Sequence, residues 1–222
     1  MNIKVASRKS PLAKAQVQEV LNELNLHHHN IHFTCLFIET TGDKDQITSL
    51  RSLDKTDFFT KEIDHLLLAG DCQIGIHSAK DLPDPLPRGL TIVAITAGVD
   101  SSDSLVLKEG QTLKGFTHPP LIATSSVRRE ESVRELIPHA LFTDIRGNIQ
   151  QRLDILNQDK IDGVVIAEAA LIRLGLTHLN RVKLPGTTVP FQGQLAIVAR
   201  ENDNEMHTLF SCIDSRVAAT IL

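Results

Sequence analysis

Aromatic residues are scarce in this sequence, and both tryptophan and tyrosine are absent. The eight phenylalanines make up the whole aromatic fraction of 4%. Proteins that bind single-stranded nucleic acid without sequence preference stack the bases on exposed aromatic rings. The composition therefore argues against such a stacking platform.

The sequence also lacks an excess of positive charge and any long apolar run. A formal net charge of −4 provides no overall basic field that would attract nucleic acid or a membrane surface. No apolar run approaches the roughly 20 residues that span a bilayer, and the start of the chain lacks the apolar core of a signal peptide. We therefore expect a cytoplasmic protein with neither nucleic acid nor membrane as a partner.

Cysteine is rare, and Cys35, Cys72 and Cys212 lie far apart without a metal-type C-x-x-C pair. Reduced thiols are the simplest expectation for such a chain. Cys72 precedes an apolar segment and is expected to be a small core residue. The three adjacent histidines at 27–29 are more typical of a solvated turn than of a ligand set, so we predict no metal site.

Strand-like and helix-like segments alternate along the chain, which predicts an α/β fold with largely parallel strands. Ser10 and Pro11 fit the N-cap and first position of a helix. Residues 40–57 are polar and predict a long mobile loop. Strands are expected at 3–7, 31–39, 72–77, 89–96, 121–126, 140–145, about 162–167 and 194–200, and helices at 10–24, 58–69, 127–136, 147–157, about 168–174 and from 204 onward.

This pattern occurs twice and predicts two similar lobes. The first lobe is expected to comprise residues 1–96 plus 191–222, and the second residues 97–190. A chain that builds one lobe, crosses to another and returns is expected to leave a cleft between them. Such clefts are preferred ligand sites.

Polar clusters follow several of the predicted strands. In open α/β sheets ligands bind beyond the carboxyl ends of strands, where helix N-termini offer free N–H groups to anions. Arginine pairs bidentately with carboxylate or phosphate, so the ligand is expected to be polyanionic. The glycine patterns of dinucleotide folds and P-loops are missing, which disfavours a nucleotide. The clusters are Arg8 and Lys9; His77, Ser78, Lys80 and Asp81; Thr124, Ser125, Ser126, Arg128 and Arg129; and Arg146, Gly147, Asn148 and Arg152.

Each cluster also has a simpler interpretation. A single arginine after a strand is more often a solvated surface charge, but four clusters at equivalent positions favour a site. Glu168 is interpreted as a helix N-terminal carboxylate rather than a catalyst. Asp81 is the candidate catalytic residue, because a carboxylate kept ionised among cations stabilises a developing cation or passes a proton. The alternative is a surface pair between Lys80 and Asp81.

Several segments together resemble the porphobilinogen deaminase family, also called hydroxymethylbilane synthase. The resemblance covers nearly the whole chain and includes the H-S-x-K-D, T-S-S-x-R-R and R-G-N-x-x-x-R motifs. The matching segments are IKVASRKSPLAKAQ, FFTKEIDHLLLAGDCQIGIHSAKDLP, IATSSVRRE, IRGNIQQRL and AEAALIRLGL.

The resemblance implies a transferase that joins four porphobilinogen molecules head to tail and releases ammonia each time, giving hydroxymethylbilane for haem and other tetrapyrrole synthesis. It implies two lobes like those of periplasmic binding proteins. By the same resemblance Asp81 is the catalytic carboxylate that stabilises the cationic azafulvene. Residues expected to bind substrate or cofactor are Arg8, Ser10, Ser78, Lys80, Thr124, Ser125, Ser126, Arg128, Arg129, Arg146, Gly147, Arg152 and Gln192.

The polar loop at 40–57 corresponds to the family's flexible lid, to which we assign Lys55 and Phe59. The family usually has Lys-Gly before the aromatic-Lys-Glu helix, whereas Thr56 and Asp57 stand there in this sequence. The family also has a C-terminal third domain, whose cysteine holds a dipyrromethane cofactor, and we expect that domain to be absent here. Cys212 lacks the small-residue context of that cysteine and is not assigned its role.

Two functions from different classes remain open at this point. The first is the porphobilinogen-polymerising transferase. The second is a catalytically incomplete, two-lobed module that binds pyrrole carboxylates. Composition and topology fit both, and the H-S-x-K-D segment favours the enzyme because carboxylate binding needs no acid at the centre of the cleft. Neither the residues nor the resemblance assigns an oligomeric state.

Overall fold

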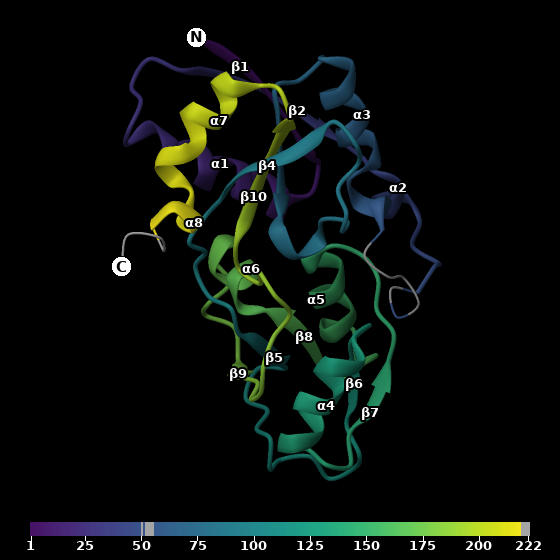
Figure 1. Ribbon diagram of the computed structural model, residues 1–222. Helices are drawn as coiled ribbons and strands as arrows, with labels where there is room; N and C mark the ends of the chain where they lie inside the picture. Colours follow the sequence, from purple (N-terminus) through teal and green to yellow (C-terminus); the bar gives the residue numbers. More distant parts are fainter. Residues whose placement is uncertain (50, 52–55, 219–222) are drawn as a thin grey trace. The chain divides into compact units, whose positions relative to one another are not determined.

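A computed structural model describes residues 1–49, 51 and 56–218, and its contacts divide the chain into two compact units (Figure 1). Unit 1 comprises Met1–Lys44, Lys55–Val99 and Gly193–Leu222. Unit 2 comprises Asp45–Asp54 and Asp100–Gln192.

The sheet of unit 1 has five strands in the order β2-β1-β3-β10-β4. β1 pairs in parallel with β2 and β3, and β10 is antiparallel to β3 and β4. The late strand β10 therefore completes a sheet whose other members come from the first hundred residues. The strands are β1 (Asn2–Arg8), β2 (His32–Ile38), β3 (Ile74–Ser78), β4 (Leu90–Ile95) and β10 (Leu195–Arg200).

Capping residues mark where helices of unit 1 begin and end. The Ser10 hydroxyl accepts a hydrogen bond from the Ala13 N–H group at 3.2 Å and caps the first long helix, as predicted. The helix before β3 ends at Gly70, whose positive φ of 79° favours glycine. The helices are α1 (Pro11–Asn25), α2 (Thr41–Lys44), α3 (Lys61–Ala69), α7 (Asn204–Phe210) and α8 (Ser215–Ala218).

Unit 2 repeats the same topology with the strand order β7-β6-β8-β5-β9. Here β5 is the antiparallel member, paired with β8 and β9. The strands are β5 (Asp103–Leu107), β6 (Leu121–Ala123), β7 (Leu141–Thr143), β8 (Gly163–Ala167) and β9 (Arg181–Lys183), and the helices are α4 (Val127–Leu136), α5 (Ile149–Asn157) and α6 (Glu168–Arg173).

Several sequence-based expectations for the elements are corrected. The helix expected at 58–69 begins at Lys61, because Asp57–Phe59 form a separate 3-10 turn. Residues 40–57 were expected to form a loop, but Thr41–Lys44 form the short helix α2. The strand expected at 121–126 ends at Ala123, because the following residues turn into α4. Strands β5 and β9 were not predicted, since their short runs carry polar residues that weaken the strand pattern.

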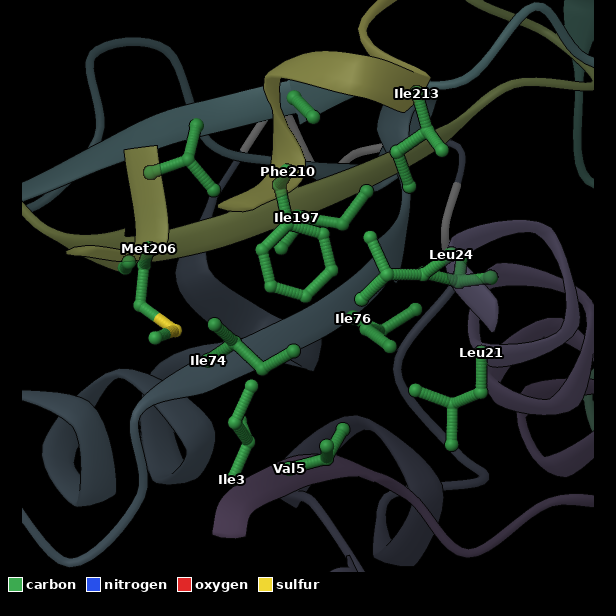
Figure 2. Close-up of a cluster of buried hydrophobic side chains, with 14 of the residues drawn as sticks. Ile3, Val5, Leu21, Leu24, Ile74, Ile76, Ile197, Met206, Phe210 and Ile213 are labelled. Carbon is green, nitrogen blue, oxygen red and sulfur yellow. The ribbon is translucent and has the colours of Figure 1, made fainter. Parts of the chain in front are cut away.

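Apolar side chains from both halves of the unit 1 sequence form its main core. Figure 2 shows the Phe210 ring of α7 surrounded by side chains such as Ile74, Ile76, Ile197 and Leu24. Phe210 is fully buried. Because burial of a phenylalanine contributes about 2–3 kcal/mol, this ring fastens α7 to the sheet of unit 1.

Within β3, alternate residues point to opposite faces of the sheet. Ile74 and Ile76 join the main core, while Gly75 and His77 face α3. A Cβ atom added at Gly75 would lie 2.9 Å from Nε2 of His77 and 2.9 Å from a methyl carbon of Ile63. Glycine at this position therefore makes room for the imidazole, and β3 delivers His77 and Ser78 to the carboxyl end of the sheet.

No helix among residues 1–49, 51 and 56–218 combines the length and apolar character that crossing a membrane requires.

Candidate functional site

Five of the predicted site residues line a single pocket of unit 1. The pocket has a volume of about 60 Å³. It lies at the carboxyl ends of β1 and β3, beside the N-terminus of α1, where an anion or polar ligand is expected in an open sheet. The predicted residues that the pocket collects are Arg8, Ser10, Phe59, Ser78 and Asp81.

Asp81 is the residue of this pocket that the protein leaves most available. It ends the short 3-10 turn η3 (Ala79–Asp81) and is exposed. Among the residues that the structure describes, none donates a hydrogen bond to its carboxylate or forms an ion pair with it. Lys80 lies beside it in η3 and is partly exposed, but it is not one of the described residues that line the pocket. Both Asp81 oxygens are therefore accessible to a ligand.

Arg8 is held by Asp43, which the sequence-based prediction did not include, and by the predicted lid residue Phe59. Its Nε lies 3.2 Å from each carboxylate oxygen of Asp43 in α2, and its Nη2 also pairs with that carboxylate. The guanidinium carbon lies 4.4 Å from the centroid of the Phe59 ring, a cation–π distance. Burial alone would raise the pKa of the Asp43 carboxyl, but Arg8 and the Thr40 bonds outweigh it and hold the pKa below its usual value. Asp43 therefore stays charged and orients Arg8.

His77 lines the same pocket with a buried, neutral imidazole. It is 6% exposed, and its Nε2 has no hydrogen-bond partner among the described residues. Burial, with a further contribution from the Arg8 charge, lowers the pKa of His77 to about 4. Neighbouring Ser78 accepts a hydrogen bond from Nε2 of Gln16 at 2.8 Å. The pocket thus combines a free carboxylate, a fixed guanidinium and a neutral imidazole.

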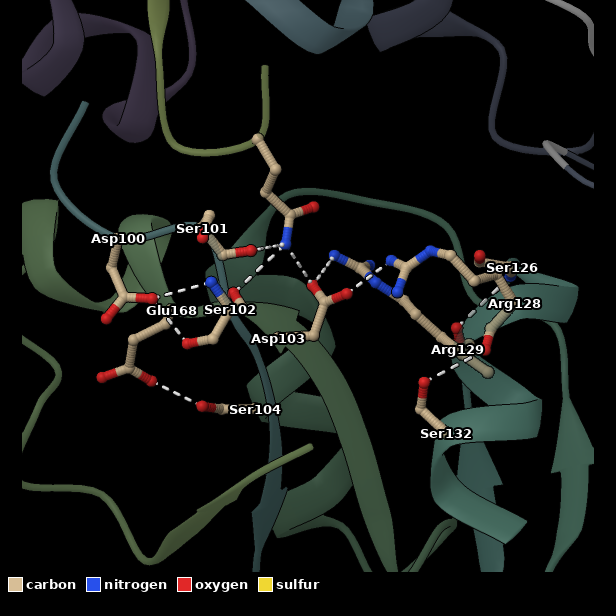
Figure 3. A network of polar contacts seen from close by, with 12 residues as sticks. Asp100, Ser101, Ser102, Asp103, Ser104, Ser126, Arg128, Arg129, Ser132 and Glu168 are labelled. Atoms are coloured by element: carbon tan, nitrogen blue, oxygen red, sulfur yellow. Dashed lines mark hydrogen bonds and ion pairs between the residues drawn. The ribbon is translucent and has the colours of Figure 1, made fainter. Parts of the chain in front are cut away.

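In unit 2, Arg128 and Arg129 share a counter-ion that the sequence-based prediction missed. Both guanidiniums pair with the carboxylate of Asp103, the first residue of β5, and Figure 3 shows them approaching it together. The Asp103 side chain is only 1% exposed. Burial would raise the pKa of its carboxyl, but the two arginines outweigh it and keep the pKa below its usual value. The pair therefore retains one net positive charge.

Gln192, one of the predicted binding residues, belongs to this network. Its Nε2 lies 2.9 Å from an oxygen of Asp103, 2.9 Å from the Ser101 carbonyl oxygen and 3.1 Å from the Ser102 carbonyl oxygen. Arg128 also donates to the Thr187 carbonyl oxygen at 3.0 Å. The loop at 187–192 is thereby tied to the arginine pair.

Thr124, Ser125 and Ser126 form the turn between β6 and α4. Thr124 is buried and its hydroxyl accepts a hydrogen bond from the Ser126 N–H group at 3.3 Å. The Ser125 hydroxyl pairs with Asp144 and lies 2.7 Å from the Ile145 carbonyl oxygen. Ser126 occupies the N-cap position of α4. The turn therefore presents hydroxyls at a helix N-terminus, although Ser125 is already bonded within the protein.

The R-G-N-x-x-x-R motif leads into α5. Gly147 has a φ of 95°, and a Cβ atom there would lie 2.8 Å from Oε1 of Gln151. Its carbonyl oxygen accepts a hydrogen bond from Nε of Arg152 at 2.9 Å. Arg146 donates to the Asp45 carbonyl oxygen at 2.5 Å. The helix expected at 147–157 begins at Ile149, because Asn148 and Gln151 form a capping box.

The segment assigned to the lid contains an arginine that the sequence-based prediction did not include. Arg51 donates to the Thr124 carbonyl oxygen at 3.1 Å and pairs with the buried carboxylate of Glu130. Thr124 is the first residue of the T-S-S-x-R-R motif of unit 2, and Glu130 directly follows that motif. Lys55, the predicted lid residue, lies outside the described residues.

Glu168 lies at the N-terminus of a helix, as predicted. Its carboxylate, however, is bonded to side chains and does not interact with the helix dipole alone. Glu168 is the first residue of α6 and is buried. Its carboxylate accepts hydrogen bonds from Nη2 of Arg181 at 2.8 Å and from the Ser104 hydroxyl at 2.5 Å. The Arg181 bond is the largest cause that holds the pKa of Glu168 below its usual value. Glu168 therefore joins α6 to β5 and β9.

The thiols do not fit covalent attachment of a cofactor at these sites. Cys72 is buried, Cys35 is partly buried and Cys212 is exposed, and burial raises the pKa of each. Raised pKa values leave less of the reactive thiolate. None of the three is among the described residues that line the pocket. Across the described part of the chain, no group of three His, Cys, Asp or Glu residues is placed to hold a metal ion.

Comparisons with known proteins identify similar sequences over nearly the whole chain. The family described as "Porphobilinogen deaminase, dipyromethane cofactor binding domain" matches residues 3–208. A "Probable porphobilinogen deaminase" of Chlamydia muridarum is 44% identical over 209 residues, which are 94% of this chain and 85% of the relative. A "Porphobilinogen deaminase" of Streptococcus sanguinis is 34% identical over 227 residues, which are 99% of this chain and 74% of the relative.

Solved structures confirm the predicted α/β fold with two lobes like those of periplasmic binding proteins. A periplasmic substrate-binding protein of an ABC transporter from Coxiella burnetii matches with a TM-score of 0.59 at 14% identity, over 98% of this chain and 94% of that chain. A probable amino-acid ABC transporter extracellular-binding protein from Bacillus subtilis matches with a TM-score of 0.58 at 10% identity, over 99% and 93% of the two chains. At such low identity these matches concern the fold alone.

Proposed function

Because the chain belongs to the porphobilinogen deaminase family, transferases of tetrapyrrole biosynthesis, we propose that it joins porphobilinogen molecules head to tail, releases ammonia and yields hydroxymethylbilane. One observation carries the proposal beyond the family. The pocket of unit 1 contains Asp81, a carboxylate without a partner among the described residues, together with Arg8, a guanidinium already held in place.

Asp81 supplies the electrostatic part of the proposed reaction. The bond between the methylene carbon and the nitrogen of the protonated aminomethyl group breaks, both bonding electrons go to the nitrogen, and the nitrogen leaves as neutral ammonia. The remaining methylene pyrrole carries a positive charge, which a nearby carboxylate stabilises. A pyrrole carbon of the partner molecule then bonds to the methylene carbon and loses a proton, which restores the charge balance.

Arg8 in unit 1 and the arginine pair in unit 2 are each proposed to bind acetate or propionate groups of the substrate or product. Arg8 is oriented by Asp43, and Arg128 and Arg129 keep a net positive charge beside Asp103. Planar guanidiniums fit carboxylates bidentately. Ser10, Ser78 and Ser126 offer hydroxyls at helix or strand ends. A growing chain of pyrroles with two carboxylates each is the polyanion that this donor set fits.

The same arginines and hydroxyls fit the carboxylates of a dipyrromethane. When bound, that group supplies the pyrrole to which the first porphobilinogen is joined. The arginine pair of unit 2, Thr124 and Arg152 are the proposed holding residues. Burial raises the pKa of each described thiol, so the arginines and hydroxyls are proposed to hold this group without a thioether bond to Cys35, Cys72 or Cys212.

The proposal is tested by incubating the purified protein with porphobilinogen and measuring released ammonia, linear tetrapyrrole and intact protein mass. We expect one ammonia for each porphobilinogen consumed and a linear tetrapyrrole in solution. Binding of porphobilinogen without ammonia release would contradict the transferase and indicate the pyrrole-carboxylate-binding module instead. A stepwise mass increase in pyrrole units would reveal a covalent primer, which peptide mapping would locate.

A further inference from the structure

Phe191 occupies a backbone conformation that a bulky residue rarely adopts. Its φ is 62°, in the left-handed region. It is the third residue of a β-turn that the Gln192 N–H group closes by donating to the Val189 carbonyl oxygen at 3.2 Å. Pro190 is the second residue, and a turn with proline there and positive φ at the third position normally has glycine or asparagine third. Phenylalanine therefore costs stability here.

The turn itself does not need the phenyl ring. The buried amide of Gln192, bonded to Asp103 and to two carbonyl oxygens, requires the chain to turn at this point. Glycine at 191 would make the same turn without strain. Phe191 is 47% exposed, so the ring is not a core residue either. Strain that neither the turn nor the core requires points to a function.

Asp159 provides a useful contrast. It and Phe191 are the non-glycine residues with positive φ in the described part of the chain. Aspartate tolerates this region because its short side chain bonds locally, and Asp159 also pairs with Lys108 at 2.8 Å. Its conformation thus has a local explanation, which Phe191 lacks.

The residues around Phe191 indicate a function for its ring. The adjacent residue, Gln192, lies 2.9 Å from the same Asp103 oxygen that Arg129 contacts. Four residues before Phe191, the Thr187 carbonyl oxygen accepts a hydrogen bond from Arg128. The loop is bonded directly to Arg128 and is linked to Arg129 through Asp103. An exposed aromatic ring in such a loop is suited to a flat, conjugated ligand that carries carboxylates.

We propose that Phe191 is a ligand-binding residue whose ring packs against a pyrrole ring of the substrate or growing product, while Arg128 and Arg129 bind its carboxylates. This inference rests on the proposed function and identifies a residue that determines affinity for the pyrrole itself. The ring contributes contact area and a π-face, and the arginines contribute charge. Free energy lost to backbone strain in the empty protein is thereby offset when ligand binds.

The test compares Phe191→Gly, Phe191→Tyr and the matched control Asp159→Gly. Phe191→Gly removes the ring and the strain together, so we expect a melting temperature equal to or above that of the unmodified protein. We also expect KM for porphobilinogen to rise about threefold to tenfold, the range of an aromatic contact, with a smaller effect on kcat. Phe191→Tyr keeps a ring and should keep KM near its original value. Asp159→Gly should leave KM unchanged.

Direct titration with porphobilinogen separates the possible failures. If the unmodified protein neither binds nor consumes porphobilinogen, the proposed function fails and this inference fails with it. If the unmodified protein binds and Phe191→Gly binds equally well, only the ring contact is overturned. A lowered melting temperature in Phe191→Gly, with KM raised equally in Phe191→Tyr, would show a structural role and would also overturn the proposal.

Discussion

Asp43 forms an ion pair with one edge of the Arg8 guanidinium. The Nε atom of Arg8 lies 3.2 Å from both carboxylate oxygens of Asp43, and the Nη2 atom of Arg8 donates to the same carboxylate. Arg8 lines the pocket that also contains Asp81. Asp43 is not among the described residues that line the pocket but holds Arg8, which does, and is therefore a positioning residue. Its partners Thr40 and Arg8 tie the short helix α2 to the carboxyl end of β1.

Asp43→Asn is expected to raise KM for porphobilinogen about tenfold, because a charge-assisted pair worth about 1–2 kcal/mol no longer orients Arg8. Steady-state ammonia release measures the change. Glu205→Gln in α7 removes an exposed carboxylate of the same unit and should leave KM unchanged. An Asp43→Asn protein with the original KM would show that Arg8 does not depend on this partner.

Asp103→Asn is expected to lower the free energy of unfolding by about 2–3 kcal/mol, because it leaves two neighbouring guanidiniums without their buried counter-ion. The midpoint of urea unfolding measures the loss. Asp154→Asn on the exposed face of α5 removes only a contact with Gln150 and should cost less than about 0.5 kcal/mol. Equal midpoints for the two variants would contradict a structural role for the Asp103 carboxylate.

Because of His77, the free energy of unfolding is expected to decrease as the pH is lowered. An unfolded histidine takes up a proton near pH 6.5, whereas burial first and the Arg8 charge second hold the pKa of folded His77 at about 4. Its contribution is therefore fully present above pH 6.5 and is lost as pH falls toward 4. Between pH 6.5 and 5 the loss is about 2 kcal/mol.

The pH prediction is checked by urea unfolding at several pH values for the original protein and for His77→Gln. The variant should show a shallower decline between pH 6.5 and 5. His29→Gln removes an exposed histidine and serves as the control. Parallel curves for the original protein and His77→Gln would contradict the assignment of His77 as a neutral buried group.

Gly75→Ala is expected to destabilise the protein by about 1–3 kcal/mol, because the added methyl group would lie 2.9 Å from His77 Nε2 and from Ile63. Thermal unfolding measures the cost. The same substitution made together with His77→Ala should cost less, because the imidazole is gone. An exposed glycine, Gly115, provides the control. If Gly75→Ala lowered stability equally in the original protein and in the His77→Ala variant, the imidazole would not be what restricts the side chain at position 75.

Sequence periodicity predicted most of the fold, because long apolar repeats and capping residues act locally. Ser10 at the start of α1 is an example, because its side chain caps the N-terminus of the helix that directly follows it. Strand β5 was missed because its run is short and begins with Asp103 and Ser104, which are polar yet buried. Their burial depends on partners far along the chain.

The candidate site was predictable to a similar extent. Arginines and hydroxyls after strands mark a site, since ends of neighbouring strands gather at one edge of a sheet. The residues that orient them, Asp43 and Asp103, carry no comparable signal. In the D-S-L-V-L segment Asp103 is separated from the apolar run by Ser104, and this arrangement gives no clear sequence signal for a buried counter-ion. Phe191 was missed because its positive φ is a property of the folded turn.

Ammonia release from porphobilinogen by Asp81→Asn tests the central claim most directly. The substitution keeps the shape of the side chain and removes the charge that is proposed to stabilise the developing cation. We expect turnover to fall by about 10²–10³-fold with the melting temperature unchanged, while Asp71→Asn, an exposed control, retains activity. An Asp81→Asn protein that releases ammonia at the original rate would contradict the account.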